Sequence, residues 1–202
     1  EEESARLLIP IVDSELPLLA AARERFEAAG VMVAVSPADA LAICDDKERT
    51  AAFFKALGLA TPRTWRPTPL GPPQNDFPVI LKPRTGGRGS LGVVCARDCE
   101  EYAFHLRRTG DCIVQEFIDG DEYTIDTLSD FGARPLAVVP RRRLEVRSGI
   151  SYKGIVVKDE RMITAACRIL EDLRIVGAAC IQCFVRGEEI VFLEINPRFG
   201  GG

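Results

Sequence analysis

The segment LEINPRFGG, residues 193–201, places polar side chains in a run that is otherwise apolar. Residues 191–193 and Ile195 are apolar, which predicts a buried β-strand. Glu194 and Asn196 are two positions apart, so in a strand they share one face, with Cα atoms about 6.6 Å apart. A carboxylate and an amide at this spacing can hold one hard cation or bridge two, and Mg²⁺ prefers such oxygen ligands. The segment therefore predicts a metal-binding strand.

A second strand is expected beside this one. The runs GAACIQCFVRG and EEIVFLEINP both have strand character, and a turn at Gly187 joins them into a predicted hairpin. In this hairpin Gln182 faces back toward Glu194, so that Gln182, Glu194 and Asn196 form a platform of oxygen donors. The alternative is that Gln182 is a polar residue on the outer face of the strand, without a ligand. Glu194 and Asn196 fit that alternative poorly because their neighbours are apolar.

A glycine-rich loop is the second constraint on function. The stretch KPRTGGRGSLG, residues 82–92, holds four glycines within seven residues. It is no Walker A motif, because Lys82 precedes the glycines and the strand VVCA, in place of a helix, follows them. A mobile loop between two strands is expected, and its backbone N–H groups could fold over phosphates. The alternative is a glycine-rich hairpin turn that binds nothing.

Bulk properties exclude several classes of partner. The 202 residues carry a formal net charge of −4, which gives no electrostatic case for binding nucleic acid or an anionic membrane. Apolar runs are far shorter than the roughly 20 residues that span a bilayer, and the acidic start EEESARLLIP does not resemble a signal peptide. The seven cysteines lie mostly in apolar runs, so we expect reduced thiols in a cytoplasmic protein. Cys180 and Cys183 should face opposite sides of a strand, which argues against a zinc or redox pair.

Periodicity and turn residues predict both helices and strands. A strand, helix and strand over residues 7–36 suggest a parallel β-α-β arrangement, with Ser36 as the N-cap of a further helix and Pro37 at its first position. Asp45 or Asp46 should cap the helix after that. The proline-rich residues 61–78 are a connection, and residues 141–154 are expected to form a basic loop near the functional face. Residues 160–177 have the pattern of an amphipathic helix.

The order of the motifs resembles that of the ATP-grasp superfamily. Asp46-Lys47, ILKP, GGRGSLG, IVQEFIDGDEY, CIQCF and EINPR follow one another over residues 45–202. Within the superfamily, the chain is similar to carboxylate–amine ligases near the carbamoyl-phosphate synthase large chain and biotin carboxylase. The resemblance implies an α+β ATP-grasp fold, in which two lobes enclose ATP. It divides the chain into a partial N-terminal α/β domain (1–44), an N-terminal lobe with the glycine-rich lid (45–117), and a truncated C-terminal lobe with the metal platform (118–202).

The resemblance also implies residue roles. Lys47 and Lys82 would contact the nucleotide phosphates, under a lid that includes Gly86, Gly87, Gly89, Ser90 and Gly92. The segment beside adenine would comprise Gln115, Glu116, Phe117 and Ile118, and Glu122 would bind the ribose hydroxyls. The metal ligands would be Gln182, Glu194 and Asn196. Many members of the superfamily have an acidic residue where this chain has Gln182, whereas the carbamoyl-phosphate synthase type also uses glutamine.

The implied chemistry is ATP-dependent ligation. A carboxylate would attack the γ-phosphate to form an acyl phosphate, which Arg198 would steady, and an amine or ammonia would then displace phosphate. The expected cofactors are ATP and Mg²⁺, with Mn²⁺ as an alternative, and a homodimer is compatible with the resemblance. Among the basic residues at 141–154, Arg147 and Lys153 are the preferred candidates for contacting an acidic co-substrate or the acyl phosphate, while Arg141, Arg142 and Arg143 have no assigned role. The alternatives are a solvated basic turn and, for the whole chain, a module that binds ATP without turnover.

Overall fold

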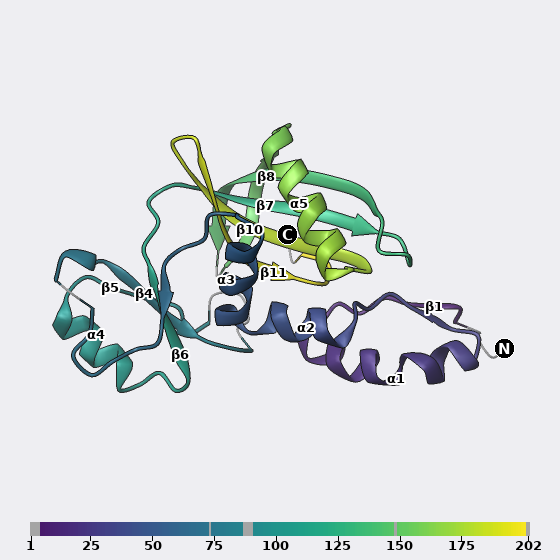
Figure 1. The fold of residues 1–202 in the computed structure, drawn as a ribbon, viewed down its shortest axis with the longest axis horizontal. Coiled ribbons are helices and arrows are strands. Elements are labelled where there is room, and N and C mark those ends of the chain that lie inside the picture. The colour runs from purple at the N-terminus through teal and green to yellow at the C-terminus, as the bar shows by residue number, and fades with distance from the viewer. Residues whose placement is uncertain (1–4, 73, 87–90, 148, 201–202) are drawn as a thin grey trace.

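The computed structural model describes residues 5–72, 74–86, 91–147 and 149–200. Its strands form sheets of two, four and five strands, each with its own helical covering (Figure 1). This mixture of helices and mainly antiparallel sheets confirms the predicted α+β class. No helix in the described part of the chain is long and apolar enough to cross a membrane.

The N-terminal part contains the predicted β-α-β unit. Its elements are β1 (Leu7–Leu8), the 3₁₀ helix η1 (Asp13–Glu15), α1 (Leu16–Ala28), β2 (Met32–Val33) and α2 (Ala38–Asp45). Strands β1 and β2 pair in parallel, as predicted. The N-cap prediction for Ser36 is wrong, because α2 starts one residue later, with Pro37 at the N-cap position. The Ser36 hydroxyl instead accepts a hydrogen bond of 3.2 Å from the backbone N–H of Val176.

The four-stranded sheet carries the glycine-rich segment. Its strands run in the order β3 (Thr64–Trp65), β6 (Cys112–Glu116), β4 (Val79–Pro83) and β5 (Val94–Ala96). Helix α4 (Cys99–Leu106) packs Tyr102 into the core of this sheet beside Leu81 and Val114. Strands β4 and β5 are antiparallel neighbours, which confirms the predicted strand–loop–strand arrangement around the glycines. A short 3₁₀ helix, η2 (Gln74–Asp76), lies in the preceding connection.

The five-stranded sheet holds the polar strand around Glu194. Its order is β11 (Glu189–Asn196), β10 (Gly177–Arg186), β7 (Asp121–Ser129), β8 (Pro135–Arg147) and β9 (Ile150–Val156), with every neighbouring pair antiparallel. Helices α3 (Lys47–Ala56) and α5 (Glu160–Leu173) cover one face of it (Figure 1). The opposite face carries polar side chains and is available to a ligand.

Two features of this sheet differ from expectation. The basic segment at 141–154 is not a loop: it belongs to the paired strands β8 and β9. Helix α3, which the sequence-based division grouped with the glycine-rich lobe, packs in the core of the five-stranded sheet, where the rings of Phe54 and Phe192 lie 5.6 Å apart. Phe54 is fully buried, so this contact fixes α3 to the sheet that carries the polar strand.

Candidate active site

A cavity of about 970 Å³ lies at the polar face of the five-stranded sheet and extends to β4 and β6 of the four-stranded sheet. This volume is in the upper part of the range of small-molecule sites. The cavity brings together most of the residues predicted from the sequence. Those among its lining residues are Lys47, Lys82, Gln115, Glu116, Phe117, Ile118, Glu122, Gln182, Glu194, Asn196 and Arg198.

The β10–β11 hairpin places the predicted metal ligands together. Gln182 lies directly opposite Glu194 in the strand register, with a bulge immediately after Gln182. The Asn196 Nδ2 group donates a 3.2 Å hydrogen bond to Glu194 Oε1, so both side chains reach the same place on one face. Across the sheet, Thr124 pairs with Gln182 on one side and with Arg141 on the other. A polar row therefore crosses four adjacent strands from Glu194 to Arg141.

The donor set of this row suits a hard cation. Carboxylate and amide oxygens match the ligand preference of Mg²⁺, which keeps the rest of its coordination sphere for water or phosphate oxygens. Among the described residues, no group of three or more His, Cys, Asp or Glu side chains is placed to hold a metal ion. The donors gathered here are instead one carboxylate, Glu194, and the amide oxygens of Gln182 and Asn196.

Two buried lysines flank this platform. Lys47 is the first residue of α3 and Lys82 lies on β4, with exposed fractions of 9% and 5%. Burial lowers the pKa of Lys82 from its ordinary 10.5 to about 8, with Glu194 acting in the opposite direction and Lys47 lowering it further. Two ammonium groups held out of water next to one carboxylate form a site that is short of negative charge. A polyanion such as a triphosphate would supply that charge.

Further acidic residues line the part of the cavity near β6 and β7. The Glu116 carboxylate is 3.4 Å from both Arg63 and Arg186, and the Glu122 carboxylate accepts a hydrogen bond from Arg143. The side chain of Gln115 donates to Thr64 Oγ1 at 2.8 Å and is buried, so it points into the four-stranded sheet. The Nε2 group of Gln115 is therefore already engaged within the sheet.

Of the predicted lid residues, the structure describes Gly86 and Gly92, at the two ends of the glycine-rich segment. Gly86 has a positive φ of 69° and lines a second, smaller cavity. Gly92 also has a positive φ, 78°, and an added Cβ there would meet Pro83 at 2.9 Å, so the end of the loop packs tightly on the end of β4. Gly87, Gly89 and Ser90 lie outside the described residues.

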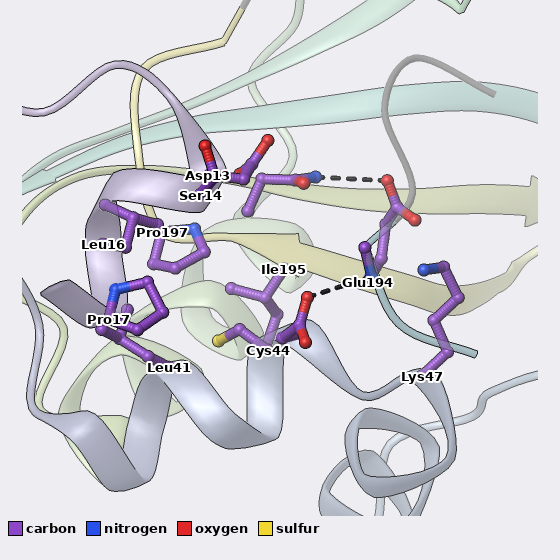
Figure 2. Close-up of a pocket in the computed structure, with 13 residues that line it drawn as sticks. Asp13, Ser14, Leu16, Pro17, Leu41, Cys44, Lys47, Glu194, Ile195 and Pro197 are labelled. Atoms are coloured by element: carbon purple, nitrogen blue, oxygen red, sulfur yellow. Dashed lines mark hydrogen bonds between the residues drawn. The ribbon is translucent and has the colours of Figure 1, made fainter. Parts of the chain in front are cut away.

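The second cavity, of about 300 Å³, lies on the other side of the β11 end (Figure 2). It is bounded by the start of α1 and the end of α2, and it has an apolar wall that includes Leu16, Leu41 and Ile195. Both cavities share the lining residues Asp13, Lys47, Glu194 and Asn196. The two cavities therefore adjoin each other at Glu194 and Asn196.

The basic residues of β8 and β9 that line the cavity are not those preferred from the sequence. Arg141 and Arg143 line the large cavity, whereas Arg147 and Lys153 are not among its lining residues. Both of the latter are exposed and pair with Glu145, at 2.6 and 3.3 Å. Strand β8 also has two register shifts between Arg143 and Arg147, one between Arg143 and Glu145 and one just after Glu145.

Two of the three arginines that sequence reasoning left without a role are held in place by the sheet. Arg141 donates to Asp126 at 3.1 Å and to Ser151 at 2.9 Å. Arg143 has only 4% of its side chain exposed and also donates to the Gly149 carbonyl at 2.6 Å, while its Nε has no hydrogen-bond partner among the described residues. In a strand, residues two positions apart share one face, so the spacing of Arg141 and Arg143 could have predicted that both face the cavity. Sequence reasoning missed this because it assigned residues 141–154 to a loop.

Arg198 reaches the cavity as expected and has a partner that the sequence did not suggest. Its Nε lies 2.7 Å from Asp13 Oδ1 on η1, so the end of β11 is tied to the N-terminal part of the chain. All seven cysteines are free thiols. Cys180 lies beside Asp126 at the cavity and Cys183 lies in the hydrophobic core, which confirms that the two face opposite sides.

Comparison with known proteins connects this geometry to a family. The model of the ATP-grasp domain family matches residues 44–202. D-alanine–D-alanine ligase from Fusobacterium nucleatum is 29% identical over 172 residues, which cover 80% of this chain and 58% of the ligase. The carbamoyl phosphate synthase large chain of Thermotoga neapolitana is 26% identical over 84% of this chain and 17% of that protein.

Solved structures show the same fold. The biotin carboxylase domain of 2-oxoglutarate carboxylase from Hydrogenobacter thermophilus, solved with MgADP, ADP and bicarbonate, superposes with a TM-score of 0.76 over 98% of this chain and 49% of that one, at 16% identity. The chain spans about three fifths of the length of two D-alanine–D-alanine ligases that it matches, those of Fusobacterium nucleatum and Aquifex aeolicus.

Proposed function

Because this chain belongs to the ATP-grasp family, we propose that it binds MgATP in the large cavity and uses it to activate a small carboxylate for attack by an amine or ammonia. The observation that carries the proposal is the convergence of two buried lysines with Gln182, Glu194 and Asn196 in one cavity. These are the groups that a metal-bound triphosphate requires.

Each part of the cavity has a role in this proposal. The segment from Gln115 to Ile118 lies beside adenine, and Glu122 takes the ribose hydroxyls. Lys47 and Lys82 neutralise phosphate oxygens. Gln182, Glu194 and Asn196 would hold Mg²⁺, which when bound shields the negative charge of the phosphates.

The reaction needs positioning and charge stabilisation more than it needs a reactive side chain. A carboxylate oxygen of the substrate forms a bond to the γ-phosphorus, and the bond to the β–γ bridging oxygen breaks, which releases ADP. The amine then attacks the carbonyl carbon of the acyl phosphate and phosphate leaves, with loss of a proton from the nitrogen. Arg198 faces the transferred group, and Arg141 is placed across the same polar row to orient the carboxylate. Arg147 and Lys153, which pair with Glu145, have no part in this proposal.

A trapping experiment tests the activity with hydroxylamine in place of the natural amine. The chain is incubated with MgATP, hydroxylamine and a panel of organic carboxylates, and both ADP and hydroxamate are measured. We expect at least one carboxylate to yield both products in equal amounts. Saturable MgATP binding with neither product from any carboxylate would support the alternative, a module that binds ATP without turnover.

Two variants make the assignment specific. Glu194→Ala removes the carboxylate of the platform and should abolish product formation, while the thermal unfolding curve stays cooperative. Glu189→Ala lies on the same strand, where its carboxylate pairs with Arg186 at 2.8 Å outside the cavity, and serves as the matched control. Equal loss in both variants would refute the assigned role of Glu194.

A further inference from the structure

The two cavity lysines belong to parts of the fold that are built around different sheets. Lys47 begins α3, which Phe54 fixes in the core of the five-stranded sheet, whereas Lys82 lies on β4 of the four-stranded sheet. Their separation therefore depends on how the N-terminus of α3 sits against the end of β4. Lys47 and Lys82 repel each other, and Glu194 offsets part of this repulsion, so a contact that joins the two segments directly would help to fix the spacing of the lysines.

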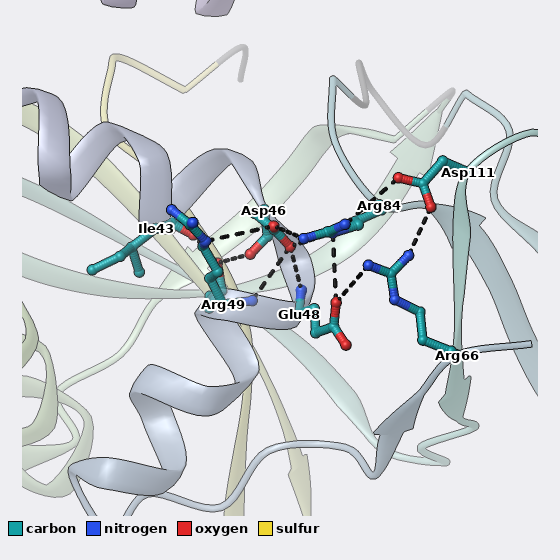
Figure 3. A network of polar contacts seen from close by, with 8 residues as sticks. Ile43, Asp46, Glu48, Arg49, Arg66, Arg84 and Asp111 are labelled. Atoms are coloured by element: carbon teal, nitrogen blue, oxygen red, sulfur yellow. Dashed lines mark hydrogen bonds and ion pairs between the residues drawn. The ribbon is translucent and has the colours of Figure 1, made fainter.

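Asp46 and Arg84 form that contact. Asp46 directly precedes Lys47, and Arg84 lies two residues after Lys82. The Arg84 guanidinium donates to both oxygens of Asp46, with Nε–Oδ1 at 3.0 Å and Nη2–Oδ2 at 2.6 Å (Figure 3). The Lys47 N–H donates to the Arg84 carbonyl at 3.0 Å. A two-point side-chain contact and a backbone hydrogen bond thus join the two lysine-bearing segments.

Asp46 both pairs with Arg84 and caps helix α3. Its Oδ1 also accepts the N–H groups of Glu48 and Arg49, at 3.0 and 3.4 Å, and so caps α3. The carboxylate is 9% exposed, and burial alone would raise its pKa. The hydrogen bonds from Arg84, Arg49 and Glu48 outweigh burial and hold the pKa of Asp46 below its ordinary value. The carboxylate is therefore charged across the neutral range and stays available to the Arg84 fork.

An outer ring of charges surrounds the pair. Arg66 lies 2.9 Å from Glu48 and 2.7 Å from Asp111, and Arg84 is 3.5 Å from Glu48 (Figure 3). The side chains of Arg66, Glu48 and Asp111 are each more than two fifths exposed, so solvent and salt screen their interactions. The bidentate pair at the buried Asp46 carboxylate is the part of the network that resists such screening.

We propose that the Asp46–Arg84 ion pair fixes the spacing of Lys47 and Lys82, so that both lysines meet the phosphates of one nucleotide. Asp46 and Arg84 are positioning residues: they act through the lysines and do not touch the ligand. The inference rests on the proposed binding of MgATP in the large cavity. It adds that phosphate affinity depends on a contact outside that cavity, since neither residue lines it.

The test separates the ion pair from the helix cap. Asp46→Asn keeps an N-cap side chain of equal quality but loses the charge that the Arg84 fork requires. Arg84→Met changes the other partner without altering the cap. Arg66→Ala is the matched control in the outer ring. Affinity for MgATP is measured by calorimetry, and affinity for adenosine, which has no phosphate, is measured by NMR line shifts.

We expect Asp46→Asn and Arg84→Met each to weaken MgATP binding by about tenfold or more, since an ångström-scale displacement of the lysines removes their contacts. Adenosine affinity should stay at the wild-type value, and Arg66→Ala should change neither affinity by more than about twofold. The double variant Asp46→Asn/Arg84→Met should lose no more than the worse single variant, because both changes break one interaction.

Three results would overturn the inference. Wild-type MgATP affinity in both single variants would show that the pair does not set the lysine spacing. Equal loss of MgATP and adenosine affinity would show a general structural role. An equal effect of Arg66→Ala would assign the role to the outer ring. If the wild-type chain itself bound no MgATP, the proposed function would fail, and this inference with it.

Discussion

Lys82 offers a quantitative test, because its ammonium group is buried before any ligand arrives. The folded chain holds the pKa of Lys82 at about 8, whereas the unfolded chain restores the ordinary 10.5. This difference of about 2.5 units corresponds to roughly 3 kcal/mol of unfolding free energy at about 1.4 kcal/mol per unit. Below pH 8 the Lys82 amine is protonated in both the folded and the unfolded chain, so burying its charge lowers the unfolding free energy by the full amount. Between pH 8 and 10.5 the unfolded chain binds more protons, so stability rises with pH.

Urea unfolding of the wild type and of Lys82→Met, at several pH values from 7 to 10.5, measures this term. The wild-type free energy of unfolding, less that of Lys82→Met, should rise by up to about 3 kcal/mol across that range. Lys55→Met, which changes an exposed lysine of α3, is the matched control. A flat profile for Lys82→Met would refute the account of Lys82 as a buried cation kept for a polyanionic ligand.

Three further predictions concern the core and the platform. Phe54→Ala should lower the free energy of unfolding by about 3–5 kcal/mol, because the fully buried ring joins α3 to the five-stranded sheet, and a loss below about 1 kcal/mol in urea unfolding would contradict this packing role. Gln182→Glu should tighten Mg²⁺ binding in a calorimetric titration, because it adds a carboxylate opposite Glu194, and unchanged Mg²⁺ affinity would argue against the platform. Tyr102→Phe should cost about 1 kcal/mol, since the hydroxyl donates to the Thr68 carbonyl at 3.0 Å, and it should leave MgATP affinity unchanged.

Local pattern predicted a large part of this fold. The helical spacing in residues 160–177 gave α5, whose buried residues include Met162 and Leu170, although the helix ends at Leu173, where Arg174 adopts a left-handed conformation. The alternation around Glu194 gave β11, and the turn at Gly187 gave its pairing with β10. These elements were predictable because each depends on residues within a few positions of one another.

Long-range contacts were not predictable in the same way. Asp46 and Arg84 are 38 positions apart, and Arg198 and Asp13 are 185 apart, so their pairing depends on the complete fold. Arg147 lies outside the cavity, and no residue pattern marks the register shifts that precede it in β8. For the same reason, the sequence could name Lys47 and Lys82 as a pair through family resemblance but could not show what holds them together.

The most direct measurement is a calorimetric titration of MgATP into the wild-type chain and into Lys47→Met/Lys82→Met. We predict saturable one-to-one binding by the wild type. Each lost charged hydrogen bond to phosphate is worth about 1.5–3 kcal/mol, so the double variant should bind about a hundredfold more weakly or worse. A folded wild-type chain that shows no saturable binding, or a double variant that binds as tightly as the wild type, would contradict the assignment of the large cavity as the ATP site.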